Sequence, residues 1–223
     1  MEQEFVVRLL ETKQVTHNVK RFRMEKPDGY GFHPGQATDV CVNRSGWQNE
    51  RRPFTFTCLM DDPYLEFTIK RYPDHHGVTD LLHQLEPGDE LLLHDVWGAI
   101  EYRGPGCFIA GGAGITPFLA ILRELRRTGM AAGNQLFFSN RTAEDVIQED
   151  ELRGILGDGA HFILSREEKE GYGHGRIDGE FLRRNVSNFK RPFYICGPDE
   201  MVKEVSGLLE GMGANAEGLV FEK

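Results

Sequence analysis

The sequence predicts two domains, a small antiparallel β-barrel followed by a doubly wound α/β domain. Its 223 residues are enough for two units of roughly 100 residues, each able to bury its own core. Up to Val96, β-branched and aromatic runs alternate with turn-forming segments. After Gly106, apolar runs alternate with amphipathic helical segments, which is typical of a parallel sheet covered by helices.

The first half reads as six short strands interrupted by one short helix. The helix is expected at about 78–85, and the spacing of the strands favours a small barrel. The expected strands are 4–16, 19–26, 37–43, 53–60, 64–72 and 90–96.

The second half reads as alternating strands and helices whose ligands would bind at the carboxyl ends of the strands. Segment 101–106 is the expected linker, so the predicted domains are 1–103 and 104–223. The expected strands are 107–112, 134–140, 161–165, 192–197 and 218–222, and the expected helices are about 116–127, 148–156, 178–184 and 199–212.

Composition excludes several classes of function. The formal net charge of -9 is spread over both halves, which argues against an extended nucleic-acid surface. No apolar run approaches the length of a membrane span and no targeting signal opens the sequence, so we expect a cytoplasmic protein. The four cysteines are far apart and include no CxxC pair, so we expect neither a zinc site nor an iron-sulfur cluster held by this chain alone.

The first segment that could take part in binding or catalysis is GGAGITPF, residues 111–118, between an apolar strand and a helix. Glycines let a backbone approach a pyrophosphate closely, and the following helix start attracts anions. Thr116 is expected to cap that helix, and Pro117 suits its first turn. Such turns also occur without a ligand, so the motif alone leaves both interpretations open.

The second segment is YICGPDEM, residues 194–201, which also runs from a strand into a helix. Cys196 falls at the carboxyl end of the strand, where a parallel sheet presents ligand groups. Alone, a buried cysteine at a turn is the commoner explanation, but two such turns in one domain favour a ligand site.

The third segment is RRPFTFTC, residues 51–58, in the barrel half. Arg52 can pair with a phosphate, Phe54 offers an aromatic face, and Thr55 lies on the same side of the strand as Thr57. Further on, residues 77–79 precede the short helix, where backbone amides and a Thr79 cap could hold a second phosphate. Alternating Phe and Thr is equally good strand composition, and a lone Arg52 is more often a solvated charge.

The order of these motifs resembles that of the ferredoxin-NADP+ reductase superfamily from about Glu4 to the C-terminus. The resemblance implies a flavin motif on segment 51–58, a flavin pyrophosphate site at the short helix, a nicotinamide nucleotide site at the glycine-rich turn, and a closure over the nicotinamide at the Cys-Gly-Pro turn. The residues concerned are, in that order, Arg52, Pro53, Phe54 and Thr55; Gly77, Val78 and Thr79; Gly112, Gly114, Thr116 and Pro117; and Cys196, Gly197, Pro198 and Met201.

The resemblance implies a flavoenzyme that exchanges hydride with NAD(P)H and passes electrons on. Thr55 would hydrogen-bond near the reactive flavin nitrogen and Cys196 would lie by the reactive nicotinamide carbon. Glu222 would match an acidic position of catalytic importance near the C-terminus. The segment that lines the flavin ring and its ribityl chain would comprise Ile69, Lys70 and Arg71.

Two departures from the family pattern stand out. Phe54 replaces the usual Tyr, which keeps an aromatic face and loses a phenolic hydrogen bond. The terminal aromatic residue that covers the flavin in many relatives is missing from VFEK, where Phe221 is a substitute or simply a strand residue. We therefore expect a more open ring face.

The resemblance favours FAD over FMN by family frequency. Ser165 and Arg166 resemble a 2'-phosphate site, with Arg141 and Arg176 as further candidates, which slightly favours NADPH over NADH, although SREEKE also reads as a solvated charged loop. The expected form is a monomer or weak dimer.

The expected acceptor is a separate carrier such as flavodoxin or ferredoxin, because two domains use up the length. A basic patch in the barrel half could attract it, although scattered charges explain these residues better: Lys20, Arg21, Arg23, Lys26, Arg44 and Arg51. The alternatives are a reductase of free flavin, ferric chelates or haem proteins, and a non-catalytic flavin or nucleotide sensor or electron-transfer subunit.

Overall fold

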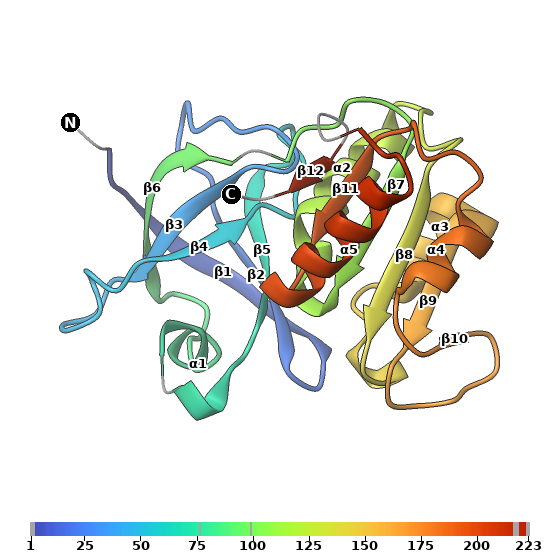
Figure 1. Cartoon of the computed structure of the whole chain (residues 1–223). Helices are drawn as coiled ribbons and strands as arrows, with labels where there is room; N and C mark the ends of the chain where they lie inside the picture. The colour runs from blue at the N-terminus through green and yellow to red at the C-terminus, as the bar shows by residue number, and fades with distance from the viewer. Residues whose placement is uncertain (1–2, 76, 99, 216–218, 222–223) are drawn as a thin grey trace. The chain divides into compact units, whose positions relative to one another are not determined.

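The computed structural model describes residues 3–75, 77–98, 100–215 and 219–221. It divides into two compact units, Met1–Gly98 and Ala99–Lys223, each with its own six-stranded sheet (Figure 1). The predicted fold class, an antiparallel β domain followed by an α/β domain, is confirmed.

The first unit is an antiparallel sheet in the order β4-β3-β6-β1-β2-β5. Its two end strands meet through an isolated bridge between Phe56 and Phe67, which closes the barrel. The strands are β1 (Phe5–Thr16), β2 (Val19–Glu25), β3 (Ala37–Val42), β4 (Arg52–Thr55), β5 (Tyr64–Lys70) and β6 (Glu90–Trp97). The predicted strand 53–60 is thus shorter than expected and begins one residue earlier.

The core of this barrel is aromatic and aliphatic. Phe32 stacks on Phe56 with ring centroids 4.2 Å apart, and Phe56 lies 5.1 Å from Phe67. The short helix α1 (Val78–Leu82) follows the 3-10 turn Pro73–His75 and adds Val78 and Leu82 to the core. It ends three residues before the predicted end because Gln84 and Leu85 bond to carbonyls three residues back, in tighter turns than those of an α-helix.

The second unit is a parallel sheet in the order β10-β9-β8-β7-β11-β12. Its strands are β7 (Cys107–Gly111), β8 (Gln135–Asn140), β9 (Ala160–Leu164), β10 (Gly173–His174), β11 (Phe193–Cys196) and β12 (Leu219–Phe221). The two-residue strand β10 was not expected from the sequence, because two residues are too short to show a period.

Helices cover both faces of this sheet. The helices are α2 (Thr116–Arg127), α3 (Glu149–Leu156), α4 (Gly179–Asn185) and α5 (Asp199–Gly211), and 3-10 turns occur at Gly112–Ile115, Ala143–Asp145 and Gly157–Gly159. On one face, Ile109 and Phe137 pack with Leu182 of α4 and Val205 of α5. On the other, Phe108 contacts Phe118 of α2, and Arg123 of α2 binds both carboxylate oxygens of Glu151 in α3 at 2.8 Å.

Within the second unit, Tyr194 anchors the segment before β7 to β11. The Tyr194 hydroxyl donates to the Gly104 carbonyl and accepts from the Arg103 amide, each at 2.8 Å. Burial raises the pKa of Tyr194 to about 12, so the hydroxyl keeps its proton at neutral pH. Tyr102 stacks on the Tyr194 ring with centroids 5.7 Å apart.

Candidate functional site

The predicted flavin motif lies on β4, where it pairs with β3. Thr55 is buried, Phe54 is half-buried, and Arg52 and Pro53 are exposed. The Arg52 guanidinium donates a hydrogen bond to the Arg51 carbonyl at 2.6 Å. Among the described residues, no carboxylate pairs with this guanidinium. Such a guanidinium can meet a phosphate.

Phe54 has two environments. Its ring lies 6.1 Å from that of Phe67, and it packs against the barrel core. Because the ring stays half-exposed, part of its surface can still stack against a planar ligand.

The three residues at the end of β5 that are expected to line a flavin have different surroundings. The Ile69 side chain belongs to the barrel core, so Ile69 could contribute only backbone atoms to a ligand. Lys70 is half-exposed. Arg71 pairs with Asp80 of α1 at 2.6 Å, which ties the strand to the helix that follows.

The helix start at residues 77–79 differs from the expectation in one respect. Gly77 is the N-cap of α1, and no side chain caps it, so Thr79 lies inside the first turn and the predicted Thr79 cap is wrong. The amides of Asp80 and Leu81 both bond to the Gly77 carbonyl, so the amides not bound within the helix lie at its very start.

The glycine-rich turn of the second unit begins with Gly112, whose φ of +53° favours glycine, and a Cβ here would meet no atom within 4 Å. This open position is where a ligand can approach the backbone. The prediction that Thr116 caps α2 is wrong: Ile115 occupies the cap position, and the Thr116 hydroxyl donates to the Ala113 carbonyl at 3.0 Å. The helix begins at the expected residue, but the 3-10 turn before it puts the cap at Ile115, and Pro117 lies in the first turn as expected.

The two turns at the carboxyl ends of β7 and β11 pack directly on each other. A Cβ on Gly114 would lie 2.3 Å from the Cys196 carbonyl oxygen, and a Cβ on Gly111 would lie 2.5 Å from the Met201 sulfur and 3.0 Å from Pro198. A Cβ on Gly197 would lie 3.1 Å from the Gly111 amide nitrogen. Most of these glycines therefore serve strand-to-strand packing, and Gly112 is the one left open.

Cys196 ends β11 opposite Ala110 of β7. Its side chain is buried, and it forms no disulfide. The carboxyl end of β7, the turn at Gly112 and Cys196 thus share one edge of the parallel sheet, as the sequence motifs predict.

The carboxyl ends of β8, β9 and β10 carry three arginines. Arg141 follows β8, Arg166 lies two residues after β9, and Arg176 lies two residues after β10; all three are exposed, and none has a recorded ion pair within the described parts of the chain. The Ser165 amide and hydroxyl both bond to the Asn140 carbonyl, at 2.9 and 3.2 Å. The backbone thus brings the ends of β8 and β9 together.

Sequence reasoning missed Asn140. Within the described parts of the chain, neither the nitrogen nor the oxygen of its side-chain amide has a hydrogen-bond partner, and both are buried at the carboxyl end of β8. A nearby acid, Glu167, accepts a bond from the Ala143 amide at 2.7 Å and so holds the loop after β8. The only sequence signal was a polar residue at the end of an apolar strand.

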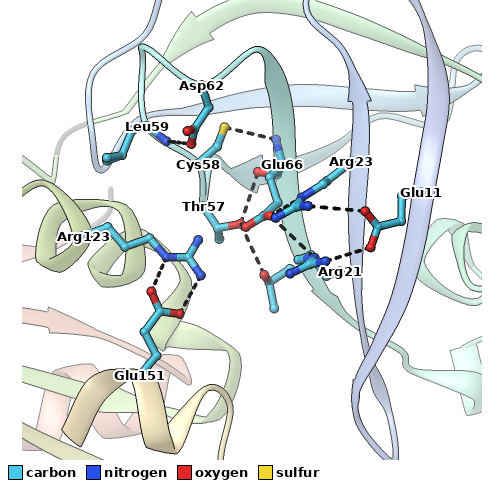
Figure 2. Close-up of polar contacts among 11 residues, drawn as sticks. Glu11, Arg21, Arg23, Thr57, Cys58, Leu59, Asp62, Glu66, Arg123 and Glu151 are labelled. Atoms are coloured by element: carbon cyan, nitrogen blue, oxygen red, sulfur yellow. Dashed lines mark hydrogen bonds and ion pairs between the residues drawn. The ribbon is translucent and has the colours of Figure 1, made fainter. Parts of the chain in front are cut away.

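Sequence reasoning also missed a buried acid in the barrel, Glu66, which is 2% exposed. Arg21 and Arg23 each form ion pairs with both Glu66 and Glu11, as Figure 2 shows. Other basic residues considered for a patch also have partners: Arg44 pairs with Asp89, and Lys20 and Lys26 donate to backbone carbonyls, which supports the interpretation of scattered charges.

Two expectations fall at the end of the chain. Glu222 lies outside the described residues. The backbone of Phe221 pairs with Ile195 in the parallel register of β12 and β11.

No helix among the described residues is long and apolar enough to cross a membrane. Residues 6–102 match the family model described as "Oxidoreductase FAD-binding domain", and residues 108–207 match "Oxidoreductase NAD-binding domain". The two matches meet at the segment between the two sheets.

Curated relatives are reductases of several systems. The chain is 28% identical to the reductase component of propane 2-monooxygenase from Rhodococcus jostii, over 99% of this chain and 64% of that protein. It is 29% identical to NADH-cytochrome b5 reductase 2 from Coccidioides immitis, over 90% of this chain and 67% of that protein. The chain thus spans about two thirds of the length of these relatives.

Solved structures share the fold. A ferredoxin NADP+ reductase from Neisseria gonorrhoeae, with bound FAD and NADP, superposes with a TM-score of 0.81 and 23% identity, over 98% of each chain. An FAD-binding and then an NAD-binding oxidoreductase domain, in the motif order described above, identify the chain as a member of the ferredoxin-NADP+ reductase superfamily.

Proposed function

We propose that this chain is a flavin-dependent oxidoreductase that passes electrons between NAD(P)H and a separate acceptor. The observation that carries the proposal is the packing of Gly114 against the Cys196 carbonyl, so close that a Cβ on Gly114 would lie 2.3 Å from the carbonyl oxygen. This packing brings the glycine-rich turn and the Cys-Gly-Pro turn to one edge of the sheet, where a nicotinamide nucleotide would meet both.

The first unit fits a flavin through side chains. Arg52 would bind phosphate, Phe54 would stack on the ring, and Thr55 would bond to the ring edge. The start of α1 would meet the second phosphate with the amides of residues 77–79. FAD, rather than FMN, remains our expectation from the family resemblance.

The second unit fits a dinucleotide through its backbone. Gly112 leaves open space where a pyrophosphate would approach, and the positive end of α2 follows directly. The three exposed arginines after β8, β9 and β10 support NADPH as the preferred donor, because a 2'-phosphate needs cations that no carboxylate already neutralises.

A bound flavin would supply the redox chemistry, since a flavin can accept a hydride and release electrons singly. The residues of this chain hold and orient: Thr55 would fix the ring edge by a hydrogen bond, and Cys196 would position the nicotinamide carbon without acting as a nucleophile. Holding the two rings at the right distance and alignment would lower the barrier to such a transfer.

Ferredoxin or flavodoxin is the acceptor that we propose first. A relative named as a ferredoxin--NAD(P)(+) reductase component of naphthalene 1,2-dioxygenase and salicylate 5-hydroxylase systems supports a ferredoxin, and the cytochrome b5 reductases support a haem protein as the second candidate. Since Arg21, Arg23 and Arg44 are engaged in ion pairs, the proposal does not rest on a basic docking patch.

The test is to titrate the purified chain with FAD and then to mix the flavin-loaded protein anaerobically with NADPH or NADH in a stopped-flow instrument. We expect bleaching of the flavin absorbance, faster with NADPH, followed by reoxidation on adding a ferredoxin, a flavodoxin or a cytochrome. A protein that binds no FAD would contradict the flavin assignment.

A protein that binds FAD without being bleached by either nucleotide would instead be a flavin sensor. An acceptor screen that finds only free flavin or ferric chelate would keep the reductase chemistry and replace the protein partner. The three outcomes separate the proposed function from its alternatives.

A further inference from the structure

Where β4 runs on towards β5, the barrel has a polar face that is buried although it points away from the core. Phe56 and Phe67 face inward and are fully buried in the core cluster. Because side chains alternate along a strand, Thr57 and Glu66 point to the opposite face. There Thr57 is 0% and Glu66 2% exposed, and Thr68, two residues after Glu66, is 5% exposed.

These side chains form a hydrogen-bonded chain. The Thr57 amide donates to the Glu66 carbonyl at 2.8 Å, and the Thr57 hydroxyl lies 3.0 Å from Glu66 Oε1. The Thr57 and Thr68 hydroxyl oxygens lie 3.3 Å apart. On the other side, Arg23 Nε donates to Glu66 Oε2 at 2.9 Å, and Arg21 Nε lies 3.6 Å from the same oxygen (Figure 2).

The hydrogen bonds from Thr68 through Thr57 to Glu66 have a fixed direction. Paired with two guanidiniums, Glu66 is a carboxylate, and a carboxylate only accepts hydrogen bonds. The Thr57 hydroxyl therefore donates to Glu66. Since a hydroxyl has one proton, Thr57 can only accept in its contact with Thr68, and Thr68 is the donor.

The register connects this chain to the predicted flavin motif. The bridge between Phe56 and Phe67 is antiparallel, so Thr57 lies opposite Glu66 and Thr55 lies opposite Thr68. Residues directly opposite each other have Cβ atoms about 5 Å apart. Thr55 and Glu66 are thus two residues apart along the paired strands, as diagonal neighbours, and a flavin edge bound at Thr55 would lie within about 10 Å of the Glu66 carboxylate.

We infer that Glu66 sets the reduction potential of the flavin without touching it. This inference rests on the proposed function. Two electrons and one proton convert the oxidised flavin to its anionic reduced form, which adds one negative charge. A buried carboxylate nearby opposes that charge, so Glu66 makes the flavin a stronger reductant for its acceptor.

The experiment compares Glu66→Gln with Glu11→Gln. Glu11 binds the same two arginines, at 2.8 and 3.3 Å, but its side chain is 46% exposed, so it is the matched control. The flavin-loaded proteins are reduced in the presence of a reference redox dye, and the ratio of reduced to oxidised flavin is read from absorbance at equilibrium.

We expect Glu66→Gln to raise that ratio about tenfold, as a unit charge at about 10 Å does at an effective dielectric constant of about 20. Glu11→Gln should change it by less than about twofold, because water screens its charge. If the wild type binds no flavin, the proposed function fails; if both variants bind flavin at the wild-type ratio, only the role of Glu66 fails.

Two further variants keep the inference testable should Glu66→Gln not fold. Arg23→Gln removes a positive charge from the same cluster, so the ratio should fall. Thr57→Val keeps the charge and the shape but breaks the hydroxyl chain, so the ratio should move less than in Glu66→Gln. A rise in Arg23→Gln, or no change in either variant, would overturn the assignment.

Discussion

The two units present their predicted ligand groups in opposite ways. In the first unit, the barrel unit, the predicted ligand groups are side chains: Arg52 and Thr55 both lie on the strand β4. In the second unit, the nucleotide unit, the predicted ligand groups belong to the backbone. Here Gly111 and Gly114 are packed so tightly that a Cβ on either would lie 2.5 Å or less from a neighbouring atom.

This difference predicts how each unit responds to substitution. A site made of side chains loses affinity when a charge or ring is removed, while the strand that carries it stays folded. A site made of closely packed backbone loses its fold when a single methyl group is added. Substitutions at Gly114, Arg52, Cys196 and His83 test that contrast.

Gly114→Ala should be the most damaging change. Its methyl group would meet the Cys196 carbonyl carbon and oxygen and the Gly197 amide at 2.3 to 2.6 Å, and backbone atoms cannot move aside cheaply. We expect a loss of at least about 3 kcal/mol in the free energy of unfolding, measured by chemical denaturation.

The control for this variant is Gly154→Ala in α3, where a Cβ meets nothing within 4 Å. Alanine should stabilise the helix there by about 0.5 to 1 kcal/mol. Equal stability of the two variants would show that the packing of the two turns does not constrain the fold.

Arg52→Ala tests the side-chain site of the barrel. Loss of a charged hydrogen-bond donor to phosphate should weaken FAD binding by about tenfold or more, with the barrel stability unchanged because Arg52 is exposed. Fluorescence titration measures the affinity. Arg44→Ala, which removes an exposed arginine paired with Asp89, should leave FAD binding as it is.

Cys196→Ala tests the shared edge of β7 and β11. We expect the rate of flavin reduction by the nucleotide to fall by about tenfold, because the nicotinamide loses a neighbour that fixes its position, while flavin content stays at the wild-type level. Rapid-mixing absorbance gives the rate. Cys41→Ala, in the barrel, should keep the wild-type rate, and a slow Cys41 variant would contradict a specific role for Cys196.

The smallest effect concerns pH. Burial lowers the pKa of His83 below the ordinary 6.5, although its ring nitrogen bonds to the Ile69 carbonyl at 2.9 Å. As pH falls through 6.5, the unfolded chain takes up a proton that the folded barrel resists, so the barrel loses stability.

Urea denaturation at about pH 8 and at about pH 6 should show this loss, and His83→Gln should reduce it. His161 in the nucleotide unit also has a pKa lowered by burial, so His161→Gln is the parallel variant for the other unit. An unchanged pH dependence in His83→Gln would contradict the assignment.

Sequence pattern predicted the fold class and the sheet edge at Gly112 and Cys196 because strand periods and glycine turns are local signals. It placed Thr79 and Thr116 at helix caps that Gly77 and Ile115 occupy, since the start of each helix depends on the preceding turn. The burial of Glu66 could not be predicted for a different reason. Alternation along a strand shows which face a residue occupies, but not that the outer face is buried.

Tyr194 has a practical consequence for dissecting the protein. Its hydroxyl bonds to Arg103 and Gly104, and its ring stacks on Tyr102, so these residues complete the packing around β11. A separately expressed nucleotide unit that started at Gly106 would leave a buried hydroxyl without partners and expose an aromatic face. The fragment to clone therefore begins before Tyr102, at about Ile100, a residue that is itself 3% exposed.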